Sequence, residues 1–565
     1  ADRESQWRSR LAAPAPLPVS QVRNELAKAR KMVTQLGALP PLDESAYAAR
    51  PPCRLWSPAG RTTSTDGLQV LPPTPESEVR VGPEGVIAAH SGELCFAEED
   101  MVLPSRGDLG FRFRRYYRSF SEYDGPMGHG WDHNHNIRIV ADAPSLSDAK
   151  TLRLHGGDFD VQFLRDGQRW AVQRGAFLSV EVQPQDMLVV TDAQRNQWTF
   201  ELAASSPQDH ACWRLQRQQT RHGPTAGNNL IYRYVSGTDV LASVEDPFGQ
   251  LVRFYYDGAG RLRLLAGPGM RAEFSYDQHG SLISATIPRV AVSLSESAAS
   301  SMEYGYRRAA GRAWCTSRRL NHSDSALFAD IDLEPDSSSF GQAKTAGYRL
   351  IAKPAERITW SFAHVAADER LHVTVTPPVP GPVIVYSFAV KAPFPWLPTE
   401  MAVPARRASW NYLYNDDGLC TRETHPEGYQ VLRRYDADSV DARSRRNCLD
   451  ERTETTATPL LGPLTAKGRT AEFLPGTAFP VCVSAYQIDA SGERRVLLEE
   501  RYEYRGNTFD LLKAVVGDES TSYFWNPRGQ ILGEVDGCGA VTLFYYLPGI
   551  PEHDMESFVD GVPEG

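Results

Sequence analysis

The chain lacks the long apolar runs, paired cysteines and strong positive charge that mark several large classes of protein. No stretch of its 565 residues approaches the roughly 20 consecutive apolar residues of a membrane-spanning helix. The run from Val383 to Val390 is too short, and predicts a buried strand. The net charge of -10 argues against a nucleic acid partner or an anionic membrane surface. The eight cysteines lie far apart without a CxxC pair, which predicts single buried thiols rather than a disulfide framework.

Common enzyme motifs are missing as well. The sequence contains no GxSxG elbow, HExxH helix, P-loop or GxGxxG fingerprint. We therefore assign no catalytic residue and no cofactor, and expect that the chain is not an enzyme. In contrast, 44 glycines and 40 prolines argue against long helices, and the 23 tyrosines, 22 phenylalanines and 11 tryptophans favour strands.

An aromatic residue, a turn residue and a glycine recur along the second half of the chain at a period of about 21 residues. A fixed period of this length is typical of stacked copies of one supersecondary unit. The repeat residues are Tyr234; Tyr256, Asp257 and Gly260; Tyr276, Asp277 and Gly280; Tyr414, Asn415 and Gly418; Tyr435 and Asp436; Tyr504; Trp525, Asn526 and Gly529; and Tyr545-Tyr546.

Each period predicts one β-hairpin. Residues 251–256 form a strand, 257–260 a turn and 261–265 the return strand, because turns of the Asp-Gly kind reach positive φ at low cost. The tyrosine beside the turn is expected to pack on the aromatic residue one period away. The Asp and Asn residues could be catalytic carboxylates or calcium ligands. We favour turn residues, whose side chains bond their own backbone.

We divide the chain into three segments. Residues 1–84 are predicted to hold one helix, over 22–36, followed by a linker or strap. Residues 85–229 contain short alternating runs that predict a mostly antiparallel sheet. Residues 230–565 carry the repeats, with polar insertions expected at 293–301, 337–341 and 441–476. The predicted fold class is all-β.

Two polar clusters precede the repeats. His129, Asp132, His133 and His135 could bind a metal such as zinc, but their strand-like spacing favours a polar strand or loop, and we assign no metal site.

The second cluster is the set of arginines in residues 111–118. Arg112, Arg114, Arg115 and Arg118 alternate with aromatic residues, a pattern that can bind single-stranded nucleic acid. The alternative is a strand with an apolar inner face and a charged outer face that protects a sheet edge. The negative net charge favours this second interpretation.

Four segments resemble the opening of Rhs proteins: residues 91–94, 98–104, 111–119 and 128–134. The residues that carry the opening motif are Arg114, Arg115, Tyr117, Gly128, Gly130 and Trp131. Together with the Tyr-Asp repeats, they make the chain similar to an Rhs, or YD-repeat, protein over roughly residues 85 to 550.

The resemblance implies a hollow β-shell, or cocoon, in which the hairpins spiral around a C-terminal toxin domain. It also implies synthesis in the bacterial cytoplasm followed by secretion or delivery into target cells, often by type VI secretion. The implied partners are the toxin domain, spike or delivery proteins, and a chaperone. The family's DPxGL core, which carries its self-cleaving aspartyl protease, is not found. Asp246-Pro247-Phe248-Gly249-Gln250 is only a partial match, so we assign no self-cleavage.

These observations lead to two hypotheses. In the first, the chain is the structural shell of an Rhs-type polymorphic toxin used in interbacterial competition, and it encloses and shields the toxin before delivery. In the second, it is a cell-surface protein that binds carbohydrate through the aromatic residues of its repeats.

Overall fold

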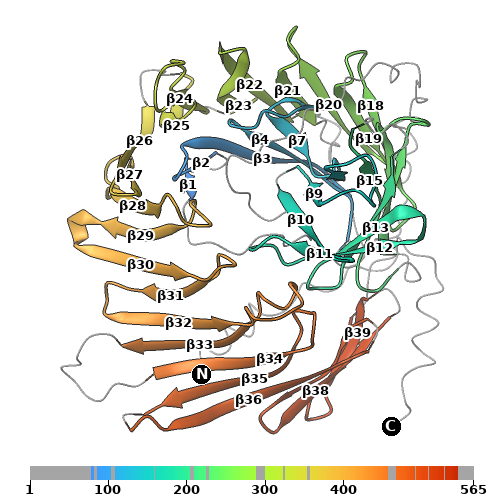
Figure 1. Ribbon diagram of the computed structural model, residues 1–565, viewed down its shortest axis with the longest axis vertical. Coiled ribbons are helices and arrows are strands. Elements are labelled where there is room, and N and C mark those ends of the chain that lie inside the picture. The colour runs from blue at the N-terminus through green and yellow to red at the C-terminus, as the bar shows by residue number, and fades with distance from the viewer. Residues whose placement is uncertain are drawn as a thin grey trace, which may run out of the picture.

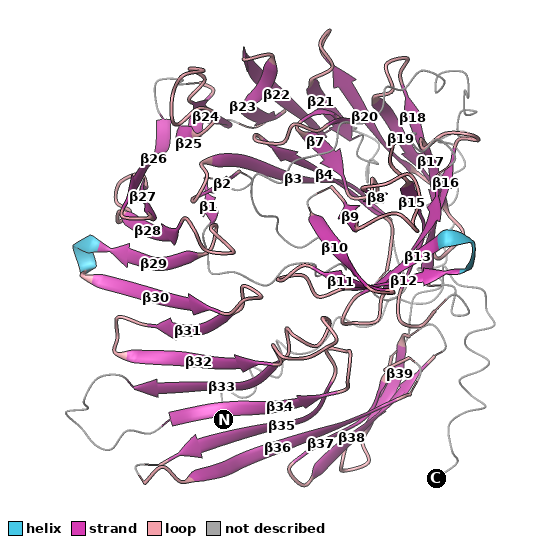
Figure 2. Cartoon of the chain, in the orientation of Figure 1, coloured by secondary structure: helices cyan, strands magenta, loops and turns pink. Residues whose placement is uncertain are grey.

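The computed structural model describes residues 78–544 apart from the gaps 82–84, 104–108, 158, 204–208, 224–227, 288–299, 322, 324, 353–356, 456–465, 490, 507 and 527–528. The helix expected at 22–36, the linker before residue 78 and Tyr545-Tyr546 lie outside the described residues. Within them, the regular structure is β-strand, interrupted by two 3-10 turns, Pro184–Asp186 and Pro404–Arg406 (Figure 2). The all-β prediction is confirmed. No helix of the described part is long and apolar enough to cross a membrane.

A small antiparallel sheet, here called the inner sheet, has the strand order β1-β2-β3-β4-β7, and a short hairpin, β5-β6, precedes its last strand. The bounds are β1 Glu78–Arg80, β2 Val86–Ala88, β3 Glu93–Val102, β4 Arg112–Arg118, β5 Asp124–Gly125, β6 Gly128–His129 and β7 Trp131–His133. The inner sheet therefore contains Arg114, Arg115, Tyr117 and Trp131 of the opening motif, and the hairpin and the turn after it contain Gly128 and Gly130.

All later strands belong to one long antiparallel sheet in which strand order largely follows chain order. Its first strands are β8 Arg138–Ala141, β9 Thr151–His155, β10 Asp160–Asp166, β11 Arg169–Val172, β12 Ser179–Gln183, β13 Met187–Thr191, β14 Gln197–Leu202 and β15 Cys212–Gln219. The next are β16 Asn229–Tyr234, β17 Leu241–Glu245, β18 Leu251–Tyr256, β19 Leu262–Gly267, β20 Met270–Tyr276, β21 Leu282–Ile287, β22 Ser300–Ala309, β23 Arg312–Leu320, β24 Ser325–Ile331, β25 Ala343–Leu350, β26 Arg357–Ala367, β27 Arg370–Thr376 and β28 Ile384–Ala389.

The remaining strands, β29–β40, are here called the distal wall. They are β29 Pro398–Val403, β30 Ala408–Tyr414, β31 Cys420–Thr424, β32 Tyr429–Tyr435, β33 Cys448–Thr455, β34 Ala466–Phe473, β35 Pro480–Ile488, β36 Arg494–Tyr504, β37 Leu511–Val516, β38 Glu519–Trp525, β39 Ile531–Val535 and β40 Val541–Leu543. Figure 1 shows these strands as a curved single layer, from β29 at the left to β39 at the lower right.

The two ends of strand β15 pair with different strands. Its first residues, 212–214, pair with β8, and its last, 217–219, pair with β16. Strands β8–β15 thus form a ring from which the long sheet continues. At the other end, β40 pairs with β39, and no further strand of the described chain has a register with it, so the sheet is not closed along its last edge.

The apolar core lies where the inner sheet packs against the first part of the long sheet. The ring of Phe113 in β4 lies 6.0 Å from Phe254 and 5.9 Å from Phe274, measured between centroids. The residues of this buried cluster run from Val81 to Phe388. The strand expected at 383–390 is β28, and its centre is buried, as predicted.

No fully buried member of that cluster lies in a strand of the distal wall, although Met401 of β29 packs against its edge. In β32 and β33, side chains on both faces are partly exposed. Within the described part of the chain, no second layer therefore buries either face of these two strands.

Two expectations from the sequence are wrong. Part of the polar insertion expected at 441–476 forms β33 and β34, because a strand exposed on both faces is as polar as a loop. The seven cysteines in the part of the chain that the structure describes are free, as expected. However, of the seven in the described residues only Cys315 is fully buried, and the others are partly or fully exposed.

Candidate functional site

The aromatic residues of the repeat share one hydrogen-bonding geometry. A register shift lies directly before Tyr256, and its hydroxyl donates to the carbonyl of Leu241 at 3.0 Å. Leu241 is the residue paired with Tyr234, the preceding aromatic residue of the repeat. Tyr276 likewise donates to Leu262, which pairs with Tyr256, at 2.7 Å. Each aromatic residue therefore links its hairpin to the one before it.

The same bond recurs along the sheet, and we call the series the aromatic ladder. Its other members are Tyr234 to Leu215 (2.8 Å), Tyr306 to Leu282 (2.7 Å), Tyr414 to Pro398 (2.9 Å), Tyr435 to Cys420 (3.2 Å), Tyr504 to Pro480 (2.8 Å) and Trp525 to Leu511 (2.6 Å). Burial raises the pKa of Tyr504 to about 12, which keeps this hydroxyl protonated as a donor. Each bond of this kind contributes about 1 kcal/mol.

The polar residues of the repeat face their own turns. The Asp257 carboxylate accepts the N–H groups of Ala259 and Arg261, both at 2.9 Å, and Gly260 between them has a φ of +77°. Asp277 and Asn415 accept the corresponding N–H groups of their own turns. The structure places these side chains at separate turns and does not bring them together. Among the described residues, no group of three His, Cys, Asp or Glu side chains is arranged to hold a metal ion.

The opening motif attaches the inner sheet to the long sheet. Arg115 makes a two-pronged ion pair with Asp100, at 2.6 and 3.1 Å, and donates to the Tyr304 hydroxyl at 2.5 Å. Both members of this pair are at least 98% buried. Desolvation opposes the charge of Arg115, but the Asp100 carboxylate outweighs it, so the arginine pKa stays well above its ordinary value.

Two aromatic residues of the motif reinforce this attachment. The Trp131 indole N–H donates to the Tyr306 hydroxyl at 2.9 Å, and the Tyr117 hydroxyl accepts the Cys315 N–H at 2.8 Å. The opening motif thus joins the inner sheet to strands β22 and β23, and we call this set of contacts the clamp.

The arginines Arg114 and Arg118 lie on the opposite face of β4 from Arg115, and they differ in burial. Arg118 is buried in an ion pair with Glu93 at 2.6 Å, whereas Arg114 is partly exposed and meets Glu99 at 3.0 Å. Our expectation of an apolar inner face is therefore wrong at Arg115, and that of an exposed, charged outer face is wrong at Arg118. These buried arginines are paired with carboxylates and cannot present a surface to nucleic acid.

The histidines near the motif turn toward different partners. His135 stacks on Phe111 at 4.7 Å, donates from Nε2 to the Arg112 carbonyl at 2.8 Å and accepts from the Tyr232 hydroxyl at 3.1 Å. Burial lowers its pKa to about 3. His129 instead contacts Arg312.

Turns from the first strands of the long sheet meet turns of the distal wall along a line that we call the seam. It comprises residues 173–178, 192–196 and 220–223 on one side and 415–419, 436–447, 474–479, 505–506, 508–510, 526 and 529–530 on the other. The Ala478 N–H donates to the Ala193 carbonyl at 2.9 Å. The guanidinium of Arg221 lies 5.3 Å from the Phe479 ring. The wall therefore returns to the ring of strands where it began.

Two fully buried carboxylates anchor the seam. Asp417 lies 3.2 Å from both Arg174 and Arg445 and accepts the Gly175 N–H. Asp510 accepts from His222 Nε2 at 2.6 Å and from the Thr508 hydroxyl at 2.7 Å. Desolvation raises the pKa of Asp510, but these bonds outweigh it and hold the pKa below its ordinary value.

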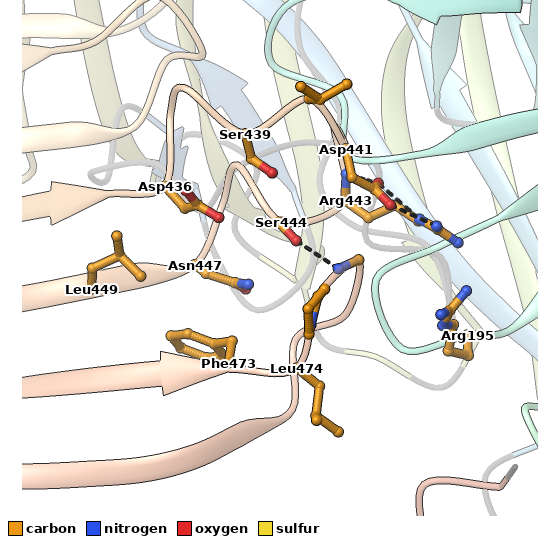
Figure 3. Close-up of a pocket in the computed structure, with 13 residues that line it drawn as sticks. Arg195, Asp436, Ser439, Asp441, Arg443, Ser444, Asn447, Leu449, Phe473 and Leu474 are labelled. Carbon is orange, nitrogen blue, oxygen red and sulfur yellow. Dashed lines mark hydrogen bonds and ion pairs between the residues drawn. The ribbon is translucent and has the colours of Figure 1, made fainter. Parts of the chain in front are cut away.

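A cleft of about 500 Å³ opens within the seam (Figure 3). Its lining residues are Arg195, Asp436, Ser439, Val440, Asp441, Arg443, Ser444, Asn447, Leu449, Phe473, Leu474, Pro475 and Gly476. Arg443 is neutralised by a two-pronged ion pair with Asp441, at 3.0 and 2.7 Å. Sequence reasoning missed this cleft, except for Asp436, because its walls come from distant segments. One signal was available: Arg195 stands where the other Asp turns carry glycine.

Comparisons with known proteins found one family model and several solved structures. The domain of unknown function DUF6531 matches residues 85–159, which hold strands β2 to β9. The Photorhabdus luminescens Tc holotoxin pore is 10% identical over 81% of this chain, with a TM-score of 0.36. A TcdB2–TccC3–TEV structure is 10% identical over 79%, with a TM-score of 0.36, and TcdB2–TccC3 without its hypervariable C-terminal region is 11% identical over 82%, with a TM-score of 0.20.

The chain spans about a quarter of the length of these structures, since it covers 25%, 26% and 24% of them. No curated protein matches the sequence.

Proposed function

We propose that the chain is the shell of an Rhs-type polymorphic toxin, which encloses a C-terminal toxin domain and shields the producing cell from it. One observation carries this proposal. The distal wall is a long antiparallel sheet with few fully buried residues, and in β32 and β33 the side chains on both faces are partly exposed. An open sheet of this size normally needs a partner on at least one face.

The contacts across the seam indicate that the sheet is curved and not flat, which supports an enclosing role. Bonds such as His222–Asp510 and Arg174–Asp417 join residues more than 240 positions apart, so the wall curves back to its own beginning. The aromatic ladder holds neighbouring hairpins in register along the wall. A guest on the concave face would be surrounded by hydrogen-bonded backbone, which resists proteases.

The finer parts of the proposal follow from the opening motif and the repeats, through the Rhs resemblance that they carry. They are synthesis in the bacterial cytoplasm, delivery by type VI secretion, and contacts with spike proteins and a chaperone. In this proposal the shell acts by steric exclusion and needs no catalytic residue, cofactor or metal.

The test is protection of a guest. A small protease-sensitive reporter domain is fused after Gly565, and its cleavage is compared with that of the free reporter under identical digestion. We expect the fused reporter to survive while the shell is folded and to be cut once denaturant opens it. Electron microscopy of the same fusion should show density inside the wall.

Two outcomes would overturn the proposal. One is cleavage of the fused reporter at the rate of the free domain. The other is a solid particle with no internal space. Binding on a glycan array, together with an unprotected reporter, would favour the carbohydrate-binding alternative.

A further inference from the structure

Arg195 occupies a position that glycine takes in equivalent turns. In the turn after β13, Asp192 accepts the Asn196 N–H at 2.8 Å, just as Asp257 accepts that of Arg261. In the Asp257 turn, the residue before the donor Arg261 is Gly260, with φ +77°. In the Asp192 turn, the residue before the donor Asn196 is Arg195, with φ +68°. Glycine adopts this conformation without steric cost, whereas an L side chain is strained there. Strain of this kind is a pointer to function.

The guanidinium of Arg195 has no acceptor in the described residues. Its Nε is buried and makes no hydrogen bond with them. Desolvation and the positive charge of Arg443 lower the pKa of Arg195, and the carboxylates of Asp441 and Glu181 offset only part of this effect. The residue as a whole is half-buried, so the cost falls on the buried Nε donor, and an acceptor that enters the cleft would satisfy it.

The lining of the cleft selects the kind of acceptor. Arg443 is already paired with Asp441, whereas Arg195 makes no ion pair with a described residue. The carboxylates of Asp436 and Asp441 repel any anion at short range, and repel a doubly charged phosphate about twice as strongly as a single carboxylate. Leu449, Phe473 and Leu474 provide apolar surface beside the charge. A single carboxylate carried on an apolar peptide fits this combination, and its planar oxygens match the arginine fork.

The chain leaves the described residues at the same end of the sheet. The turn that precedes β39 belongs to the seam, since a Cβ on Gly529 would meet the His222 ring at 2.1 Å. β40 runs back along β39, and the Phe544 N–H donates to the Leu532 carbonyl at 2.9 Å, close to that turn. Residues 545–565 follow, and extended they reach about 70 Å.

This following segment has the matching chemistry. It contains no lysine or arginine, and its acidic residues alternate with apolar ones. The acidic residues are Glu552, Asp554, Glu556, Asp560 and Glu564.

We propose that the cleft at Arg195 binds a side-chain carboxylate of residues 545–565, so that this acidic segment is held across the seam. Arg195 then supplies a forked pair of donors to the carboxylate, and the apolar part of the lining covers the neighbouring side chains. The proposal does not depend on what the wall encloses.

The test is hydrogen exchange of residues 545–565 in the full chain, measured by mass spectrometry for the wild type and for Arg195→Gly. Glycine suits the left-handed turn, so this variant removes the guanidinium and relieves the backbone. We expect exchange in 545–565 to become at least about tenfold faster, the equivalent of one lost charge-assisted bond. Arg407→Gly is the matched control, because Arg407 is also left-handed, at φ +51°, but exposed and outside the cleft. We expect this control to leave the segment protected.

A second variant tests the same contact from the other side. Asp554→Asn, Glu556→Gln and Asp560→Asn combined remove three carboxylates without touching the seam, and should accelerate exchange as much as Arg195→Gly. Two results would refute the proposal: a segment that exchanges at the rate of a free peptide in the wild type, or equal protection in all variants. Either would mean that the cleft does not bind this segment through Arg195.

Discussion

The guanidinium of Arg195 lies 5.4 Å from the centroid of the Phe509 ring, and both residues have left-handed backbone, with φ of 68° and 56°. Their turns are separated by most of the long sheet, yet they meet at the seam. Phe509 in turn stacks on Phe479, with ring centroids 5.3 Å apart and an angle of 7° between the planes. Two strained turns thus supply side chains to one contact, which indicates that the seam is a built feature of the fold and not an incidental approach.

The seam can be tested with two glycines of equal backbone geometry. Gly529 and Gly539 have φ of 77° and 81°, but a Cβ at Gly529 would meet the His222 ring at 2.1 Å, whereas at Gly539 it meets open space. Gly539→Ala should cost about 1–2 kcal/mol for the backbone alone. Gly529→Ala should cost about 1.5–3 kcal/mol more, because His222 must move away from Asp510.

Denaturant unfolding and limited proteolysis at the seam turns would measure this difference. If the two alanine variants unfold at the same midpoint and are cut at the same rate, the seam contributes nothing to the stability of the wall.

The aromatic ladder predicts a hydroxyl-specific effect. Tyr256→Phe removes the bond to the Leu241 carbonyl and leaves the ring in place, so we expect a loss of about 1–2 kcal/mol in the free energy of unfolding. Tyr523→Phe is the control, since the Tyr523 hydroxyl makes no hydrogen bond within the described part of the chain, and its effect should stay within about 0.5 kcal/mol. Equal effects of the two substitutions in urea titrations would show that the ladder bonds are replaced by water at no cost.

The buried ion pair of the opening motif should behave differently from its exposed neighbour. Arg115→Met leaves the Asp100 carboxylate buried without a partner and should cost about 3–5 kcal/mol. Adding Asp100→Leu should recover most of this loss. Glu99→Gln, which breaks the exposed pair with Arg114, should cost less than about 1 kcal/mol. Thermal unfolding of the wild type, Arg115→Met, Asp100→Leu and the double variant completes the cycle, and a double variant as unstable as the sum of the two single ones would contradict the clamp.

Local chemistry explains which features the sequence could predict. The turn at Asp257 needs only its own neighbours, because the carboxylate bonds N–H groups two and four residues on. Hairpin turns were therefore predictable from short segments. The acceptor of Tyr256 was not, because it depends on register shifts that displace the tyrosine relative to Leu241.

Features that depend on contacts between residues far apart in the chain could not be predicted from the sequence. The burial of Arg115 requires Tyr304 and Asp100 from two other strands, and nothing in the run of residues 111–118 marks one arginine as buried and the next as exposed. β33 looked like a loop because both of its faces are polar, and this polarity makes sense only in a wall with no layer packed on it. Arg195 was the exception, since an arginine in a glycine position is visible in one sequence.

Acid should destabilise the protein through His135. Burial lowers the pKa of His135 to about 3 in the folded protein, whereas the ordinary value for the unfolded side chain is 6.5. Between these two pH values, the unfolded chain therefore binds a proton at His135 that the folded protein does not bind. The stability is complete above about pH 6.5 and falls as the pH drops toward 3. Each pH unit in this window costs about 1.4 kcal/mol, or about 2 kcal/mol between pH 6.5 and 5.

The variant His135→Gln separates this titration from the rest of the acid response. Glutamine can keep a donor toward the Arg112 carbonyl but takes up no proton, so the loss in unfolding free energy between pH 6.5 and 5 should shrink by about 2 kcal/mol. The exposed His279→Gln serves as the matched control, and we expect it to retain the wild-type pH profile. Parallel profiles for His135→Gln and the wild type would show that His135 is protonated in the folded protein. The hydrogen bond that its Nδ1 accepts from Tyr232 would then have to be reversed or broken, because a protonated imidazole offers donors at both nitrogens.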